Sequence, residues 1–346
     1  NNYDSVEFEQ LDDNGWLLVP GNLKTIFESI ENQSESLESL IGSENIYNGI
    51  QTSANNIYIH TATNKDEKFY YFQKDGADWK IEKELTRPYY KTSSGSDNLN
   101  TYRPFSPNAF VIYPYLKTDE GIQFVEIEQL ESDYPNAFAY LNHYKAILND
   151  SKRDIKPTPE TENEWYRYGR HQSLDKCDVP AKIIVGVLSQ GNKYAIDYYG
   201  TLISSGGTAG YCMITLPNDF PYSIYYIQAL LNSKYLEWFS ALNGEVFRGG
   251  YIARGTKVLK KLPIRTIDFE NETEKELHNK IASLQEGLIQ LQGQIDQNEG
   301  NQRELIPLKR QFDNKKTELV ATLKSLFNLG EGDNLIPLIS ELYAAH

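Results

Sequence analysis

The sequence predicts an α+β fold: mixed, β-rich lobes with packed helices, followed by a C-terminal antiparallel helical hairpin. Three observations predict it. Short apolar or alternating runs, typical of strands, recur between residues 46 and 216. Stretches with apolar residues at helical spacing separate these runs. Beyond residue 270 the pattern changes to unbroken heptads, which indicate paired helices.

Residues 1–45 are expected to form a helical connection to a preceding domain. Apolar residues recur at helical spacing in two stretches, at Leu23, Ile26, Phe27 and Ile30, and then at Leu37, Leu40 and Ile41. Gly42 follows the second stretch and supplies a helix stop. The first fifty residues hold ten acidic side chains and one basic one, Lys24. Such an acidic face is typical of a solvated surface, or of one that docks on another domain, and it disfavours nucleic acid at this end.

Two lobes are predicted next, over residues 46–155 and 156–269. Strands are expected at 57–59, 68–73 and 109–115 in the first lobe, and at 181–188, 193–199 and 210–216 in the second. Helices are expected at 134–149 and 222–243. The polar, Pro-rich stretch 155–163 marks the boundary between the lobes.

The helical hairpin is predicted within residues 270–346. Its apolar positions alternate spacings of four and three residues in a first series, Leu277, Ile281, Leu284, Leu288, Leu291 and Ile295. A second series follows the polar turn 298–301, at Leu308, Phe312, Leu319, Leu323 and Leu326. One interpretation is an antiparallel hairpin that packs on itself or on a neighbouring part of the chain, and another is a dimerising coiled coil. Lys315, in the middle of the second series, disfavours a long dry interface.

A basic segment between Glu245 and Asp268 reverses the charge of the chain. The formal net charge is −14, yet no acidic residue occurs in this gap. It contains six cations, Arg248, Arg254, Lys257, Lys260, Lys261 and Arg265. A Gly-rich basic segment after a helix is typical of a phosphate-binding surface. We therefore expect DNA phosphate contacts from Arg248, Arg254, Lys257, Lys260 and Lys261; the alternative is a solvated loop.

A second cluster, WYRYGRHQ at residues 165–172, combines aromatic and hydrogen-bonding side chains. An arginine fork can bind guanine or phosphate, and a glutamine amide can pair with adenine. We expect Arg167, Arg170 and Gln172 to read DNA base edges, while Trp165 anchors their strand in the core. The alternative interpretation buries Trp165 and Tyr168 and places the arginines in ion pairs.

Common catalytic signatures do not occur in the sequence: there is no phosphate-binding loop, nucleophile elbow, zinc-protease helix or dinucleotide loop, and no Asn-Pro-Pro-Tyr tetrad for a flipped adenine. The five histidines share no ligand spacing with Cys177 and Cys212, and His171 favours a hydrogen-bonding role. No metal or cofactor is expected on this chain. No signal peptide or membrane span is expected either, and the two cysteines fit a reducing cytoplasm. The chain starts without Met, which predicts a fragment of a longer protein.

The order of these motifs resembles the C-terminal specificity domain of TaqI-like adenine-specific DNA methyltransferases, which include fused type II restriction-modification enzymes. The matching pieces run in order through residues 46–268: GIQTSANNIYI, YPY, AYLNHYKAILNDSKR, WYRYGRHQSL, AKIIVGVL, GTAGYCMITL, YIQALLNSKYLEWF and LKKLPI. The helices after residue 270 resemble the spacer helices of restriction specificity subunits.

The resemblance implies two functions in two parts of one parent chain. An upstream catalytic domain binds S-adenosylmethionine and methylates a flipped adenine, and the lobes found here are recognition lobes that select the sequence in double-stranded DNA. The expected function is therefore sequence-specific target recognition in a restriction-modification or phage-defence system. No methylation is assigned to these residues, because they lack the catalytic motifs. A protein-interaction or scaffolding module acting through the hairpin is the alternative, and a hydrolase with a divergent site is a third interpretation.

Overall fold

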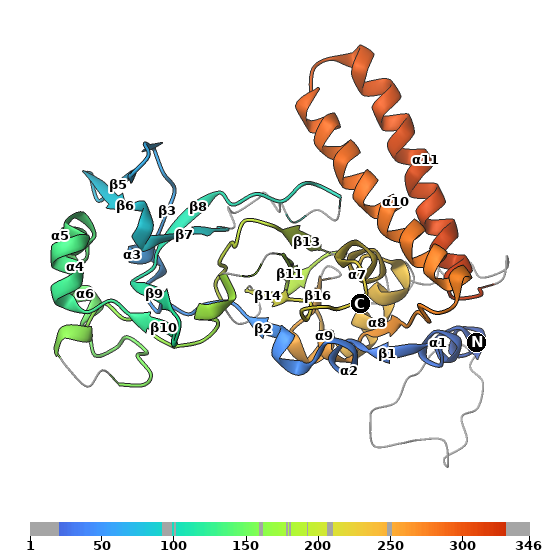
Figure 1. The fold of residues 1–346 in the computed structure, drawn as a ribbon, viewed down its shortest axis with the longest axis horizontal. Helices are drawn as coiled ribbons and strands as arrows, with labels where there is room; N and C mark the ends of the chain where they lie inside the picture. The colour runs from blue at the N-terminus through green and yellow to red at the C-terminus, as the bar shows by residue number, and fades with distance from the viewer. Residues whose placement is uncertain are drawn as a thin grey trace.

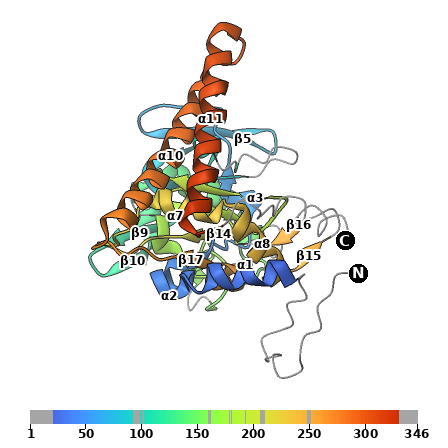
Figure 2. The same ribbon diagram turned by 90° about the vertical axis from the view of Figure 1, so that its right-hand side faces the viewer.

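A computed structural model shows an elongated α+β molecule, with two β-rich lobes side by side and a long helical pair that projects from the second (Figure 1). The predicted fold class is confirmed. The structure describes residues 21–91, 99, 102–158, 162–177, 179, 181–191, 193–205, 210–247 and 251–329. The helical pair stands out from the body in the turned view as well (Figure 2).

Small antiparallel sheets and short helices make up the first lobe. Its strands are β3 (Ile59–His60), β4 (Asn64–Lys65), β5 (Phe69–Lys74), β6 (Ala77–Glu82), β7 (Thr86–Tyr89), β8 (Ala109–Ile112), β9 (Tyr115–Thr118) and β10 (Gly121–Phe124). They pair in the orders β3-β8-β7, β4-β5-β6 and β10-β9. The helices are α3 (Asn55–Tyr58), α4 (Ile127–Asp133), α5 (Pro135–His143) and α6 (Lys145–Leu148). Buried tyrosines fill much of the core, among them Tyr58, Tyr113, Tyr115, Tyr140, Tyr166 and Tyr168.

The second lobe is centred on a four-stranded antiparallel sheet. Its strands are β2 (Ile46–Asn48), β11 (Lys182–Gly186), β13 (Tyr194–Asp197) and β14 (Tyr211–Ile214), in the order β13-β11-β14-β2. Lys182 and Asp197 lie opposite each other and form a fully buried ion pair, with Nζ 3.1 Å from Oδ2. Smaller sheets flank it, formed by β12 (Leu188–Ser189), β16 (Tyr251–Ala253) and β15 (Val246–Phe247), and by β1 (Ser34–Ser36) with β17 (Pro263–Arg265).

Helices cover this sheet and supply most of its core. They are α1 (Gly21–Glu31), α2 (Leu37–Ile41), α7 (Ile224–Leu231), α8 (Lys234–Asn243) and α9 (Thr256–Lys261). The predicted stop after the second helical stretch is present, since Gly42 has a φ of 86°. Two of the three strands predicted for the first lobe and all three predicted for the second are confirmed.

The hairpin consists of α10 (Glu272–Gln297) and α11 (Gln302–Leu326). The lower parts of both helices belong to the core of the second lobe, where Ile281, Leu284 and Leu288 meet Leu319 and Leu323. A buried hydrogen bond, 2.9 Å long, runs from Gln285 Nε2 on α10 to Gln228 Oε1 on α7. The hairpin therefore packs both on itself and on the neighbouring lobe, as the first of the two interpretations predicts.

Residues 57–59 form the end of helix α3 and the start of β3, so the predicted strand is wrong over its first two residues. The apolar alternation is misleading here because Ile57, Tyr58 and Ile59 are all buried, with no solvent-facing side. Thr52 Oγ1 also accepts a hydrogen bond from Ala54 N (3.0 Å), which favours the helical turn.

Two helices predicted as continuous are each divided in the structure. The 134–149 stretch breaks at Tyr144, whose hydroxyl donates to Asp75 Oδ2 at 2.8 Å. The 222–243 stretch breaks before Ser233, whose hydroxyl caps α8 by accepting from Leu236 N at 3.3 Å. The apolar periodicity continues through both breaks, and a local side-chain cap is present at the second.

The core of the first lobe includes side chains from beyond residue 156, among them Trp165, Tyr166, Tyr168, Leu174 and Leu202. The division into separate domains, with its boundary near residue 156, stays a prediction. A third, smaller cluster includes Tyr90, Phe105, Ile184, Ile203 and Met213.

Candidate nucleic-acid interface

Residues 169–173 run along residues 48–52, with an antiparallel bridge between Gln51 and Arg170. Four hydrogen bonds hold them: Gly169 N to Thr52 O (3.0 Å), Arg170 N to Gln51 O (3.1 Å), Gln172 Nε2 to Gly49 O (2.7 Å) and Ser173 Oγ to Asn48 O (2.6 Å). Position 169 has no room for a side chain, because a Cβ there would lie 1.8 Å from Ser53 Oγ. The predicted base-reading residues 170 and 172 are therefore presented by a fixed backbone.

Arg167 precedes this stretch and is mostly covered, with 12% of its side chain exposed. Its Nη1 donates to Glu164 Oε2, and its Nη2 lies 2.9 Å from His171 Nε2. The guanidinium also lies 5.7 Å from the centre of the Phe124 ring. Its charge is directed toward Glu164, and its role at a base edge stays a prediction.

Arg170 lies at the surface, with 45% of its side chain exposed. Its Nε and Nη2 donate to Asp154 Oδ2 at 3.1 and 2.8 Å. This hydrogen bond lowers the pKa of Asp154, and Lys156 Nζ lies 3.6 Å from the other carboxylate oxygen. Exposed ion pairs contribute little to stability, so Arg170 can exchange Asp154 for another acceptor.

Trp165 and Gln172 are the first and last residues of the predicted cluster. Trp165 is 2% exposed and packs edge to face against Tyr166, which agrees with the predicted anchoring role. Gln172 is half-buried. Its amide nitrogen binds Gly49 O, and its role in base reading stays a prediction.

Helix α9 carries three of the predicted phosphate contacts. Lys257 and Lys261 are exposed, and neither forms an ion pair with another described residue. Lys260 is partly covered: its Nζ lies 3.0 Å from Glu38 Oε1 and also donates to Ser43 Oγ. This contact lowers the pKa of Glu38. Two cations on α9 are thus open to solvent, while the third is engaged with α2.

Arg254 is fully buried, unlike the other predicted phosphate contacts that the structure describes. Its Nη1 donates to Ser189 O (2.9 Å) and Ser189 Oγ (2.8 Å), and its Nη2 lies 3.8 Å from Glu237 Oε1. A guanidinium with no exposed surface cannot contact phosphate in this conformation, so a phosphate contact would require Arg254 to leave Ser189. Arg248 lies outside the described residues. Arg265 pairs with Glu274 at 3.1 Å.

Strand β2 brings the two predicted segments together. Helix α9 packs on β2. Asn48, the last residue of that strand, accepts the hydrogen bond of Ser173 and pairs with Cys212 on β14. Helix α9 and the 169–173 stretch therefore both contact one strand, although about eighty residues separate them in the sequence.

Two residues of this surface were not among the predicted contacts. Lys176 Nζ lies 5.1 Å from the ring centre of Tyr47, which is on β2. His171 is exposed between Arg170 and Gln172. Although the side chain is exposed, neighbouring groups partly desolvate its ring, and this, together with the nearby Arg167, lowers the pKa of His171. The basic character of Lys176 is visible in the sequence, but its place beside β2 is not.

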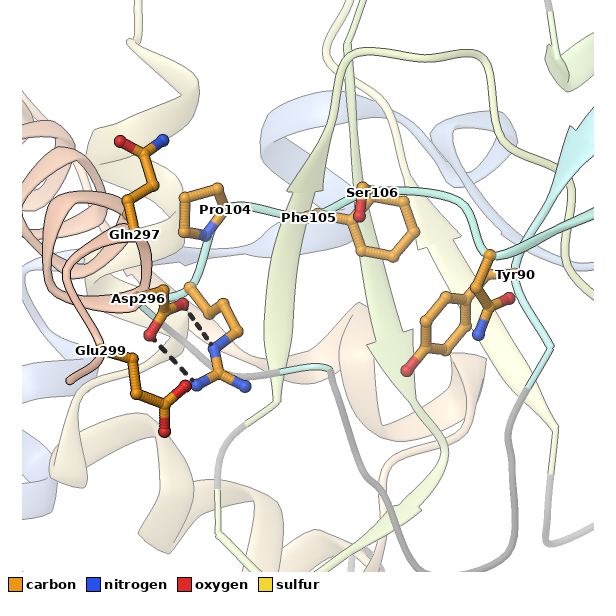
Figure 3. A pocket seen from close by; sticks show the side chains of 10 residues that line it. Tyr90, Pro104, Phe105, Ser106, Asp296, Gln297 and Glu299 are labelled. Atoms are coloured by element: carbon orange, nitrogen blue, oxygen red, sulfur yellow. Dashed lines mark hydrogen bonds and ion pairs between the residues drawn. The ribbon is translucent and has the colours of Figure 1, made fainter.

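A cavity of about 470 Å³ opens between the 103–108 segment and the end of α10 (Figure 3). Arg103 is one of its lining residues and pairs with Asp296, with Nε–Oδ2 at 2.9 Å and Nη2–Oδ1 at 3.2 Å. Tyr102 packs edge to face on Phe312 of α11. These contacts of Arg103 and Tyr102 therefore connect the first lobe to the outer part of the hairpin. Most of the neighbouring 92–101 stretch lies outside the described residues.

Within the part of the chain that the structure describes, no group of His, Cys, Asp and Glu side chains is arranged to hold a metal ion. The same residues include no helix with the length and hydrophobicity needed to cross a membrane.

Comparison with known proteins gives two findings. Residues 126–264 match the family model of the TaqI-like C-terminal specificity domain. The Escherichia coli protein "Type II restriction enzyme and methyltransferase RM.Eco57I" is 48% identical over 340 residues, which are 98% of this chain and 34% of that protein. The chain thus spans about a third of the length of this curated relative. The resemblance predicted from the sequence is confirmed: residues 126–264 form a TaqI-like C-terminal specificity domain.

Proposed function

We propose that this chain selects the DNA target of an adenine-specific methyltransferase in a restriction-modification or phage-defence system. The observation that supports it best is the convergence on β2 of an exposed basic helix and a rigid stretch rich in hydrogen-bonding side chains. Phosphate contacts position a protein on DNA, and base-edge contacts specify the sequence. The two groups of side chains around β2 have the chemistry for these two roles.

Lys257 and Lys261 are the proposed phosphate contacts, with Lys260 joining when it leaves Glu38. Arg170 is the first of the proposed base readers, because its guanidinium is exposed and its partner Asp154 is at the surface. Arg167 and Gln172 belong to the same group, although both already have protein partners. Each reader would form or exchange hydrogen bonds when DNA replaces water.

The proposal includes a longer parent protein, because the relative is named as both a restriction enzyme and a methyltransferase. The partners are then double-stranded DNA and the catalytic part of the same parent chain, in the cytoplasm. S-adenosylmethionine would bind to that catalytic part and supply the methyl group. The residues of this chain hold and orient the DNA, and no chemical step is placed on them.

Salt-dependent binding of duplex DNA tests the proposal. The double substitution Lys257→Ala and Lys261→Ala should reduce the slope of log affinity against log salt by ~0.9 for each lost phosphate contact. Affinity should fall about equally on all sequences. Lys65→Ala with Lys68→Ala is the control, since these exposed lysines belong to the first lobe: Lys65 ends β4 and Lys68 directly precedes β5, which lies away from α9 (Figure 1).

An unchanged slope in the α9 variant would remove α9 from the interface. If the unmodified chain shows no affinity for any duplex at low salt, the proposed function itself is wrong. If the chain bound every duplex sequence with equal affinity, it would position DNA without selecting a target, and this result would also contradict the proposed function.

A further inference from the structure

His171 differs from its neighbours because one of its side-chain nitrogens, Nδ1, has no hydrogen bond to any described residue. The nitrogens of Arg167, Arg170 and Gln172 already donate to Glu164, Asp154 and Gly49, respectively. The imidazole of His171 is exposed, and its Nε2 lies 2.9 Å from Arg167 Nη2. Among the described residues, no hydrogen bond to its Nδ1 occurs.

The contact with Arg167 determines the tautomer of the His171 ring. A guanidinium has only donors, so Nε2 must accept, and the single proton of the neutral imidazole is on Nδ1. The ring also packs edge to face on Tyr115, with centres 5.5 Å apart. Two contacts therefore hold the ring in place and define Nδ1 as a donor that the protein leaves unused.

We propose that His171 is a specificity-determining residue that donates one hydrogen bond from Nδ1 to an acceptor on a base edge in the major groove. The inference rests on the proposed function. In the major groove, guanine N7 and O6, adenine N7 and thymine O4 accept hydrogen bonds, whereas the amino groups of adenine and cytosine only donate. His171 thereby discriminates at one position of the target. Arg167 acts here as a positioning residue instead of reading a base itself, because its contact with Nε2 sets which ring nitrogen carries the proton.

Three substitutions at this exposed position separate the roles of the two ring nitrogens. In His171→Asn the side-chain amide reaches the place of Nδ1, and in His171→Gln it reaches the place of Nε2. His171→Ala removes both. The full chain carrying each substitution is used to select duplexes from a randomised library, and base preferences are compared with those of the unmodified chain. Thermal unfolding checks that every variant is folded.

The expected result is a preference at one position that His171→Asn retains and that His171→Gln and His171→Ala reduce roughly fivefold to tenfold, about the value of one hydrogen bond. The inference is overturned if all three variants keep the preference, or if Asn loses as much as Gln. A uniform loss of affinity on every sequence also overturns it, because that result indicates a phosphate contact. If the unmodified chain selects no sequence, the failure lies with the proposed function instead.

Discussion

Arg254 shows how the environment of a single side chain decides its role. In the sequence it is one of six cations in a basic run, and nothing there distinguishes it from Lys257 or Lys261. In the structure it is enclosed between Ser189 and Glu237, while the two lysines remain exposed. Charge alone therefore predicts a basic surface, but it does not predict which of the cations lie on it.

His60 gives a pH-dependent prediction. Burial lowers its pKa from 6.5 to about 4, and its Nε2 lies 2.7 Å from Ile57 O and 2.8 Å from the Tyr140 hydroxyl. Because the folded pKa lies below the unfolded one, the unfolded chain binds the proton more readily between these values. The stabilising contribution is therefore complete above about pH 6.5 and is lost as the pH falls toward about 4.

Urea unfolding between pH 7 and pH 4 measures this contribution. Stability of the unmodified chain should decrease relative to that of His60→Asn, by at most about 1.4 kcal/mol per pH unit. Carboxylates titrate in both proteins and cancel in the comparison. Parallel curves for the two proteins would show that His60 is not buried in its neutral form.

At the scale of elements, the hairpin is the clearest case for a test of packing. Leu284 on α10 and Leu323 on α11 are 6% and 4% exposed and lie in the core of the second lobe. Leu284→Asp or Leu323→Asp places an unpaired charge there and should destabilise the fold by roughly 3–5 kcal/mol or more. Ile306→Asp, on α11 but 67% exposed, is the matched control and should change stability by less than about 0.5 kcal/mol.

Denaturant unfolding of the three variants measures the difference. Equal stability of Leu284→Asp and Ile306→Asp would mean that the hairpin does not pack on the lobe as described. Because its lower part is core, the hairpin is more than a spacer, and removing it should expose the apolar faces of α7 and α8.

Elements with a single dominant pattern could be predicted from the sequence. The continuous apolar run at 181–188 and the heptads after 270 correspond to β11 and to α10 and α11. The breaks at Tyr144 and before Ser233 could not, because the apolar stripe continues through both of them. Short strand β2 was also missed, since its three residues form a strand only by pairing with β14, far along the chain.

At the scale of the whole molecule, the segment from Tyr102 to Phe105 connects the first lobe to the outer hairpin. Arg103 and Asp296 are 193 residues apart and form a two-point ion pair. Alanine substitution of either should accelerate hydrogen exchange at the end of α10, with a coupling energy of about 0.2–1 kcal/mol in a double-mutant cycle. The charge-swapped pair Arg103→Asp with Asp296→Arg should restore slow exchange.

Unchanged exchange in both single variants would show that the ion pair does not hold the hairpin. This long-range contact could not be predicted from the sequence, and neither could the contact of both residues 169–173 and α9 with the segment that begins at β2. The composition of the sequence predicts the two segments separately. Their common neighbour follows from tertiary packing, which periodicity does not encode.

Residues 46–53 belong to both lobes: they begin as an edge strand of the second lobe's sheet and continue as the backbone partner of residues 169–173. The distance between the basic helix and the hydrogen-bonding stretch is therefore set by main-chain geometry. Replacements at the exposed positions 170 and 171 change the chemistry offered to a base without changing that distance. Under the proposed function, a new target sequence can then arise by substitution at a few surface positions, while the alignment of the protein along the double helix stays constant.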